Sequence, residues 1–254
     1  MVAFPHILWQ IRAELLRVLN EYRIYWFDYF AGMVVDVSFF VTLILGIQAV
    51  ARAPDLDVSG PLLMYAAYGI VSSLLQLVAK DTYLEASRGT LEHLALARGG
   101  LVQQALLRAL ANILFLTLHL GLLVGILALI FRIPLHPMVW FPLPFLALLL
   151  ASLGFSFLMG AMALLFRRVS STFVIVQFLF APYFFILLEW KPFMAYLPFA
   201  PGAHLLRQGL TGGSFDPLLF LLALSQGVAL ASAGLWAFAR IYAMARRQGI
   251  FGRY

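Results

Sequence analysis

The residues that could carry out chemistry are few and scattered. The chain contains no cysteine, and its only two lysines stand in the pairs Lys80-Asp81 and Lys191-Pro192. Neither lysine completes a glycine-rich GxxxxGK[ST] loop, so the phosphate-binding motif of ATPases is absent. The five histidines are dispersed without HExxH or i,i+4 spacing, which disfavours a zinc site, and no GxSxG nucleophile motif occurs. We therefore expect no enzymatic activity, and no metal or cofactor bound by this chain itself.

Four polar residues lie within or beside otherwise apolar stretches and are candidates for a transport route. They are Asp36, His119, Gln177 and Glu189. An ionised side chain inside a membrane costs a few kcal/mol unless it is paired or hydrated, so such positions often mark pathways. Other interpretations stay open, because Asp36 could pair with Arg17 or Arg23 near the membrane surface and Glu189 with the adjacent lysine. Hydrogen bonds between helices would equally explain the histidine and the glutamine.

The longest polar stretch, residues 80–109, contains a second group of candidates. Gly89 is expected to end one helix, and Thr90 is a good N-cap for the next. Glu92 would then lie in the first turn, where the helix dipole favours an anion. Leu91 and Leu94 would give this short helix an apolar side that a groove on a partner protein could hold.

The elements that must position these residues are membrane-spanning helices. Apolar residues make up 63% of the 254-residue chain and charged residues only 11%, against roughly 25% charged in soluble domains. A span needs about 20 mostly apolar residues. Six stretches qualify: Phe30–Ala51, Leu62–Ala79, Leu110–Phe131, a stretch within Met138–Phe166 starting near Pro144, Thr172–Leu188 with a kink expected at Pro182, and Leu218–Ala239. None alternates with a two-residue period, so we predict an all-α integral membrane protein with a single six-span domain over residues 30–254.

The distribution of positive charge predicts the orientation. Thirteen of the 17 lysine and arginine residues fall in residues 1–29, 80–109, 167–171 and 240–254. Because positive residues accumulate on the cytoplasmic side, both termini are expected there. Fifteen arginines against two lysines are typical of a GC-rich bacterial source, so the expected location is a bacterial plasma (inner) membrane.

Two flanking segments are predicted to lie at the membrane surfaces. In residues 1–29, apolar and aromatic side chains repeat at three- and four-residue steps from Leu8 to Tyr29, which predicts a cytoplasmic amphipathic interfacial helix. The outer segment Trp190–Asp216 is long, rich in apolar residues and broken by prolines and glycines, which predicts a re-entrant-like segment between the fifth and sixth spans.

Two runs of small residues predict close packing between helices. They are the pair Gly121/Gly125 and the series Ser152/Ser156/Gly160. Packing within one subunit is the expected role of both runs, and contact between two copies is the alternative.

The segment Glu85-Ala-Ser-Arg-Gly-Thr-Leu-Glu-His-Leu94 resembles a pattern found in the membrane subunits of type-2 ABC exporters. In that family an acidic residue precedes Arg-Gly-Thr-Leu-Glu and a leucine on the cytoplasmic loop between spans two and three. The matching positions here are Arg88, Gly89, Thr90, Leu91, Glu92 and Leu94. The stretch Leu197-Pro-Phe-Ala-Pro-Gly-Ala-His-Leu-Leu-Arg207 is similar to the outer segment of the same family. One departure is Ala97-Arg98-Gly99-Gly100, where the family usually has a proline after the coupling helix.

The resemblance implies a permease that exports a hydrophobic or amphipathic substrate, such as a drug or a lipid. It implies a second permease copy, or a close relative, and two cytoplasmic ABC ATPase subunits that bind the ATP. The ATPase-coupling site would comprise Glu85, Arg88, Gly89, Thr90, Leu91, Glu92 and Leu94. Arg88 and Glu92 would be its polar contacts, and capping of the short helix is the alternative role of Glu92. A secondary transporter driven by an ion gradient, and a polysaccharide- or glycolipid-exporting permease of the same family, remain alternatives. No nucleic-acid partner is expected.

Overall fold

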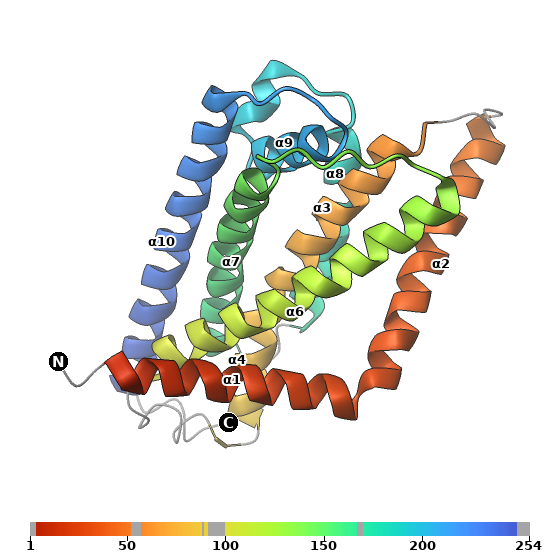
Figure 1. Cartoon of the computed structure of the whole chain (residues 1–254). Coiled ribbons are helices and arrows are strands. Elements are labelled where there is room, and N and C mark those ends of the chain that lie inside the picture. Colours follow the sequence, from red (N-terminus) through yellow and green to blue (C-terminus); the bar gives the residue numbers. More distant parts are fainter. Residues whose placement is uncertain (1–3, 52–56, 88, 91–99, 167–169, 248–254) are drawn as a thin grey trace.

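The computed structural model describes residues 4–51, 57–87, 89–90, 100–166 and 170–247, and these residues form an all-helical fold without a β-strand (Figure 1). The helices are α1 (Phe4–Ile24), α2 (Trp26–Ala51), α3 (Ser59–Leu75), α4 (Leu77–Ser87), α6 (Gly100–Phe131), α7 (Pro142–Leu165), α8 (Ser170–Ile186), η1 (Pro192–Tyr196), α9 (Ala200–Leu210) and α10 (Pro217–Arg247). The helix α1 lies across one end of the bundle, and η1 and α9 lie at the other (Figure 1). We call these the α1 end and the α9 end.

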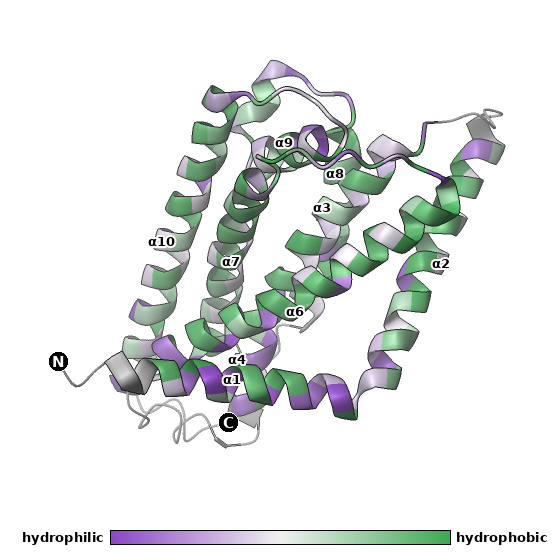
Figure 2. Ribbon diagram, viewed as in Figure 1, coloured by the Kyte–Doolittle hydropathy of each residue, from purple (hydrophilic) through white to green (hydrophobic). Residues whose placement is uncertain are grey.

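Five helical segments of the described chain are long and apolar enough to cross a membrane. They are Trp26–Ala49, Ser59–Ala86, Gly100–Phe131, Pro142–Leu165 and Pro217–Arg247. Hydrophobic residues predominate along these segments, whereas hydrophilic residues gather on α1 and α4 at one end and on the connections at the other (Figure 2). The predicted fifth span is α8, which has 17 residues and continues through Pro182. This helix is shorter than the length expected of a span, so the structure is compatible with a multi-pass membrane protein without fixing six crossings.

The predicted cytoplasmic stretch 80–109 is more helical than the sequence suggested. The helix α4 extends to Ser87, and α6 starts at Gly100, ten residues before the predicted third span. The first turns of α6 can hold polar residues because α1 packs against them: the Gln103 side chain donates a hydrogen bond of 2.9 Å to the Gln10 side chain. The N-terminal segment also differs, since α1 ends at Ile24 and Trp26 already begins α2.

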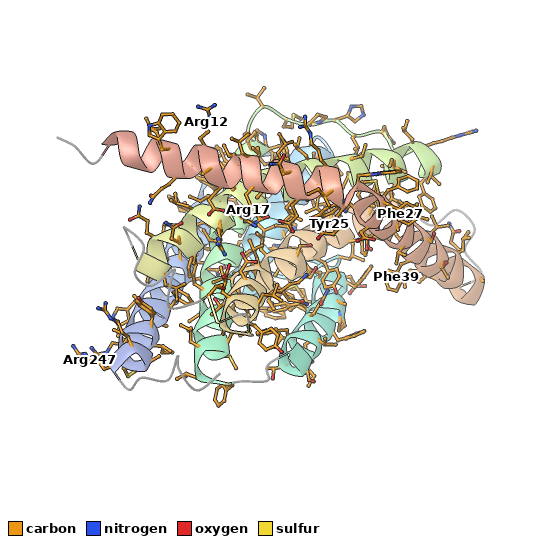
Figure 3. All side chains as sticks on the ribbon, turned by 90° about the horizontal axis from the view of Figure 1, so that it is seen from below. Arg12, Arg17, Tyr25, Phe27, Phe39 and Arg247 are labelled. Atoms are coloured by element: carbon orange, nitrogen blue, oxygen red, sulfur yellow. The ribbon has the colours of Figure 1, made fainter. Side chains whose placement is uncertain are left out.

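The polar side of α1 faces the bundle, which the sequence did not predict. Arg17 points toward the other helices, whereas Arg12 points away from them (Figure 3). The side chain of Glu14 is only 12% exposed, while Trp9 and Leu16 are exposed. The carboxylates are drawn inward because Arg108 on α6 lies there. The exposed side of α1 therefore combines apolar and basic residues, a composition suited to a membrane surface.

The second predicted span is interrupted at Gln76. The helix α3 ends at Leu75 and α4 starts at Leu77, so the break falls in the middle of an apolar stretch. The backbone N–H of Val78 donates a hydrogen bond of 3.1 Å to the hydroxyl of Ser156 on α7. A buried backbone donor released by a helix break must find such a partner in a membrane, so Ser156 stabilises this discontinuity.

The helices α7 and α10 pack through glycine. A Cβ atom added at Gly154 would lie 2.2 Å from the Leu230 carbonyl carbon, and one at Gly234 would lie 2.0 Å from the Gly154 carbonyl oxygen. The prediction of close packing along Ser152/Ser156/Gly160 is confirmed, since all three residues are buried in α7. The same prediction is wrong for Gly121/Gly125 among the residues that the structure describes, because none of them lies within 4 Å of a Cβ added at either glycine.

The segment Trp190–Asp216, predicted to be an outer re-entrant-like segment, folds as a cap over the α9 end. Residues Ala200 to Ala203 and Leu205 to Leu206 of α9 are buried, and the cap packs against α7, α10 and α3. Phe199, which precedes α9, adopts a left-handed φ of 66° and is 2% exposed among Phe155 and Phe180. The packing of these aromatic rings thus stabilises a left-handed backbone conformation that residues with a side chain rarely adopt.

Candidate functional site

Three of the four polar residues predicted for a route lie on one cavity. Asp36 on α2, His119 on α6 and Gln177 on α8 all line a cavity of about 220 Å³. Asp36 is ten residues into α2, about 15 Å along the helix axis at 1.5 Å per residue. Its carboxylate Oδ2 lies 3.8 Å from Nε2 of His119. The expected alternative, a pair with Arg17 or Arg23 near the surface, is not what the structure shows for Asp36.

A fourth helix, α3, also lines this cavity, and its contribution was not identified from the sequence. Tyr65, Tyr68, Ser72 and Ser73 line it together with Gly69. The Tyr65 hydroxyl donates a hydrogen bond of 3.4 Å to the backbone carbonyl of Asp36 and so ties α3 to α2. Their spacing of three to four residues places these polar groups on one face of α3. That spacing was visible in the sequence, but it stood in a stretch otherwise typical of a span.

A second, larger cavity continues the first toward the α1 end. It measures about 390 Å³ and shares Ser72, Ser73 and Gln177 with the first. Gln76, at the break between α3 and α4, donates a hydrogen bond of 2.5 Å to the Gln177 side chain across it. Lys80 and Arg17 line its far side. Polar side chains therefore follow the bundle interior from the α1 end to Asp36.

An ion-pair network joins three helices at the α1 end. Nη1 of Arg108 lies 2.7 Å from Oε1 of Glu85 on α4, and its Nε lies 3.4 Å from Oε1 of Glu14 on α1. Glu14 also pairs with Arg17 at 2.7 Å, which reaches Glu21 at 3.3 Å. The side chains of Glu14, Glu85 and Arg108 are 12–17% exposed. Such charges are stable at low exposure because each has an opposite charge in contact.

The network reaches the start of the predicted coupling segment. Gly89 has a positive φ of 69°, and its N–H bonds to the carbonyl of Ala86 at 3.2 Å, which confirms that Gly89 ends a helix. The Thr90 hydroxyl donates to the Glu85 carboxylate and to the Glu85 backbone carbonyl. Thr90 is therefore held by the preceding helix. The remaining predicted coupling residues lie outside the described residues: Arg88, Leu91, Glu92 and Leu94.

An aromatic stack fixes the corner between α1 and α2. The rings of Tyr22 and Tyr29 stack with centroids 3.8 Å apart, and Phe115 of α6 lies 5.0 Å from Tyr22. Burial raises the pKa of Tyr22 to about 12, and the charges of Tyr29 and Glu21 act in the same direction. The Tyr22 phenol is thus neutral at physiological pH, and the corner is rigid where α1 meets α2 and α6.

The fourth route candidate is elsewhere. Glu189 is exposed in the turn that follows α8, and it lines neither polar cavity.

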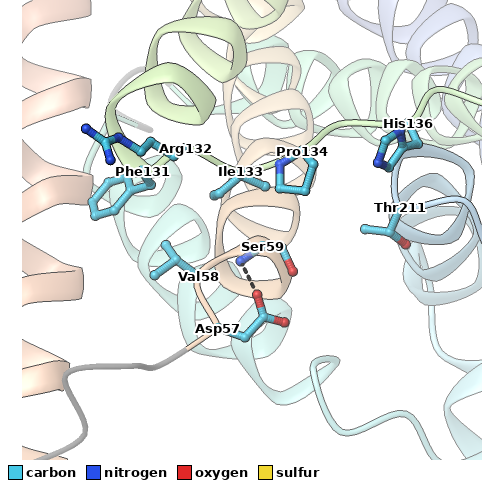
Figure 4. Close-up of a pocket in the computed structure, with 9 residues that line it drawn as sticks. All are labelled: Asp57, Val58, Ser59, Phe131, Arg132, Ile133, Pro134, His136 and Thr211. Atoms are coloured by element: carbon cyan, nitrogen blue, oxygen red, sulfur yellow. Dashed lines mark hydrogen bonds between the residues drawn. The ribbon is translucent and has the colours of Figure 1, made fainter.

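A separate cavity of about 410 Å³ opens at the α9 end (Figure 4). Its lining includes Arg132, His136 and Asp57, whose pKa is lowered by hydrogen bonds from Ser59. This cavity contains none of the residues predicted from the sequence.

Comparison of the chain with protein families, with curated proteins and with solved structures finds no match. The functional argument therefore depends on the residues and on their arrangement.

Proposed function

We propose that the chain is the membrane subunit of an ATP-driven exporter of the type-2 ABC class. It would work with a second permease copy, or a close relative, and two cytoplasmic ATPase subunits, and would move a hydrophobic or amphipathic substrate outward. It would itself hydrolyse no ATP. The observation that carries the proposal is the position of the described start of the motif: Glu85 contacts both Thr90 and Arg108, the residue at which α1, α4 and α6 are joined.

This position suits a part that receives force. A motion imposed on residues 88–94 would reach Glu85 and Thr90 directly, because the two are hydrogen-bonded. From Glu85 it would pass through Arg108 to α6 and through Glu14 to α1. Because these ion pairs are short and largely shielded from solvent, α1, α4 and α6 would move together, as a rigid-body switch between two states requires.

The interior supplies the other requirement, a route. The cavity at the α1 end is lined by Gln76 at the helix discontinuity, and it shares Ser72, Ser73 and Gln177 with the Asp36 cavity. Broken helices at membrane depth are tolerated where they line a cavity. In this proposal the α1 end is cytoplasmic, in agreement with the distribution of positive charge.

The test is association with the ATPase. The substitution Glu92→Arg should abolish co-purification of the chain with ATPase subunits from its native membrane, while insertion and dimerisation persist. The matched control is Glu189→Arg, the same change at an exposed site at the opposite end, which should leave association intact. If Glu92→Arg retains its ATPase and its transport as well as the wild type does, the coupling site is wrong.

A secondary transporter is the second candidate, and the Asp36–His119 contact favours it. Titratable pairs inside spans often couple transport to protons. Transport by the purified chain alone in vesicles, driven by a pH gradient without ATP, would support this candidate. Transport that requires both ATP and the ATPase subunits supports the exporter.

A further inference from the structure

We infer that the Asp36 cavity is a binding site for the positively charged group of an amphipathic organic cation, such as a lipophilic amine or phosphonium. The inference rests on the proposed function, because it names the substrate class of the exporter. It is carried by the combination of one available carboxylate with aromatic rings in a single cavity.

The carboxylate is available to a ligand. The Asp36 side chain is 47% exposed, although the residue is in the middle of α2. Its contact with His119 is 3.8 Å long, which is beyond hydrogen-bond range. A cation entering the cavity could therefore approach Asp36 without displacing a strong partner.

The walls suit an organic cation better than a metal ion. Phe39, Tyr65 and Tyr68 line the cavity around Asp36, and the Tyr65 ring lies 6.2–6.3 Å from the other two. Aromatic faces attract organic cations and recognise quaternary ammonium groups. The described residues place no group of three or more potential metal ligands together, and the lining here offers one carboxylate.

Two apolar side chains of α6 next to His119 would accommodate the hydrophobic part of the ligand. Leu120 and Leu123 of α6 are 8% and 2% exposed and line the same cavity. Neither lysine nor arginine belongs to its lining, whereas the adjoining cavity contains Arg17 and Lys80 beside Glu21 and Asp81. No lysine or arginine of the lining therefore balances the charge of the Asp36 carboxylate, and an anionic ligand would be repelled.

The test is direct binding to the purified full-length chain in nanodiscs. The probe is radiolabelled tetraphenylphosphonium, and radiolabelled tetraphenylborate, an anion of similar size and shape, is measured in separate samples. Binding of the cation should be saturable and displaced by excess unlabelled cation, whereas the anion should show no saturable binding that depends on the chain. Asp36→Asn should weaken binding at least about 10-fold. The control Glu189→Gln, an exposed carboxylate outside the cavity, should change it less than 2-fold.

The aromatic contribution has its own pair of variants. Tyr65→Leu should weaken binding about 3- to 10-fold, whereas Tyr65→Phe, which keeps the ring, should bind within about 2-fold of the wild type. Retention of helicity and of a monodisperse elution profile identifies variants that fold. Unchanged affinity of a folded Asp36→Asn variant, or equal saturable binding of tetraphenylborate, overturns the cation site.

The outcomes separate this inference from the proposed function. If the ATPase co-purifies with the chain and no saturable cation binding occurs, the exporter stands and the cation site is refuted. If the cation binds through Asp36 and no ATPase associates, the exporter is refuted and the binding site stands.

Discussion

Arg108 is the residue on which the α1 end depends, and its replacement gives the sharpest prediction of stability. The substitution Arg108→Gln removes contacts of 2.7 Å to Glu85 and 3.4 Å to Glu14. Truncating one partner of a buried ion pair costs about 3–5 kcal/mol, because the remaining charge stays desolvated. Here Glu14 keeps Arg17 at 2.7 Å, so we expect the lower figure of about 2–3 kcal/mol.

The measurement is reversible unfolding in mixed micelles, followed by circular dichroism. The double variant Arg108→Gln/Glu85→Gln should lose less than the sum of the two single variants, with a coupling of about 1–2 kcal/mol. Arg240→Gln, which removes an exposed arginine from α10, should change stability by less than about 0.5 kcal/mol. Additive single and double variants, or equal losses for Arg108 and Arg240, would refute the network as an energetic unit.

Two further predictions concern the α9 end and the helix packing. Burial and the charge of Arg207 lower the pKa of His204 to about 4, while Asp216 acts in the opposite direction. In the unfolded chain the His204 imidazole takes up a proton at a pKa of about 6.5. The free energy of unfolding should therefore be at its full value above that pH and fall by about 2–3 kcal/mol toward pH 4. In the His204→Phe variant the free energy of unfolding should vary less with pH across this window. An unchanged pH dependence would contradict the role given to His204. Gly154→Ala should destabilise the chain by about 3 kcal/mol or more in the same unfolding assay, because the added Cβ would clash with the backbone of α10. Gly121→Ala has no described atom within 4 Å of the added Cβ, so it should be neutral or stabilising by up to about 1 kcal/mol. Equal effects of the two variants would contradict the packing of α7 on α10.

The sequence predicted the helices well because a membrane allows few alternatives. Apolar length alone identified the all-helical class, and five of the expected spans correspond to long apolar helices. The end of α4 shortly before Gly89 was also predictable, since glycine tolerates the positive φ found there. These features depend on local composition, which a single sequence displays directly.

Features that depend on tertiary contact were missed. The break at Gln76 was not predicted, because it depends on a distant contact that the sequence of α3 does not indicate. The Val78 N–H bonds to Ser156, which lies 78 residues further along the chain. The inward orientation of Glu14 was missed for the same reason, since it follows from Arg108 on α6. Amphipathic periodicity identifies an apolar face and a polar face, and it does not say which face meets the protein.

The candidate site was predicted in part. Asp36, His119 and Gln177 were chosen as isolated polar residues, and the structure brings them onto one cavity. Glu189 was chosen by the same criterion and lies in an exposed turn. The contributions of Tyr65 and Tyr68 were missed, because an aromatic residue in a span is as compatible with packing as with a binding wall.

The central claim is that residues 88–94 face the cytoplasm and receive force from a separate ATPase. The chain has no cysteine, so a single Glu92→Cys substitution provides a unique label for a membrane-impermeant maleimide. We expect Cys at this position to be protected in intact cells and labelled in inverted vesicles. Labelling from outside intact cells would contradict the account.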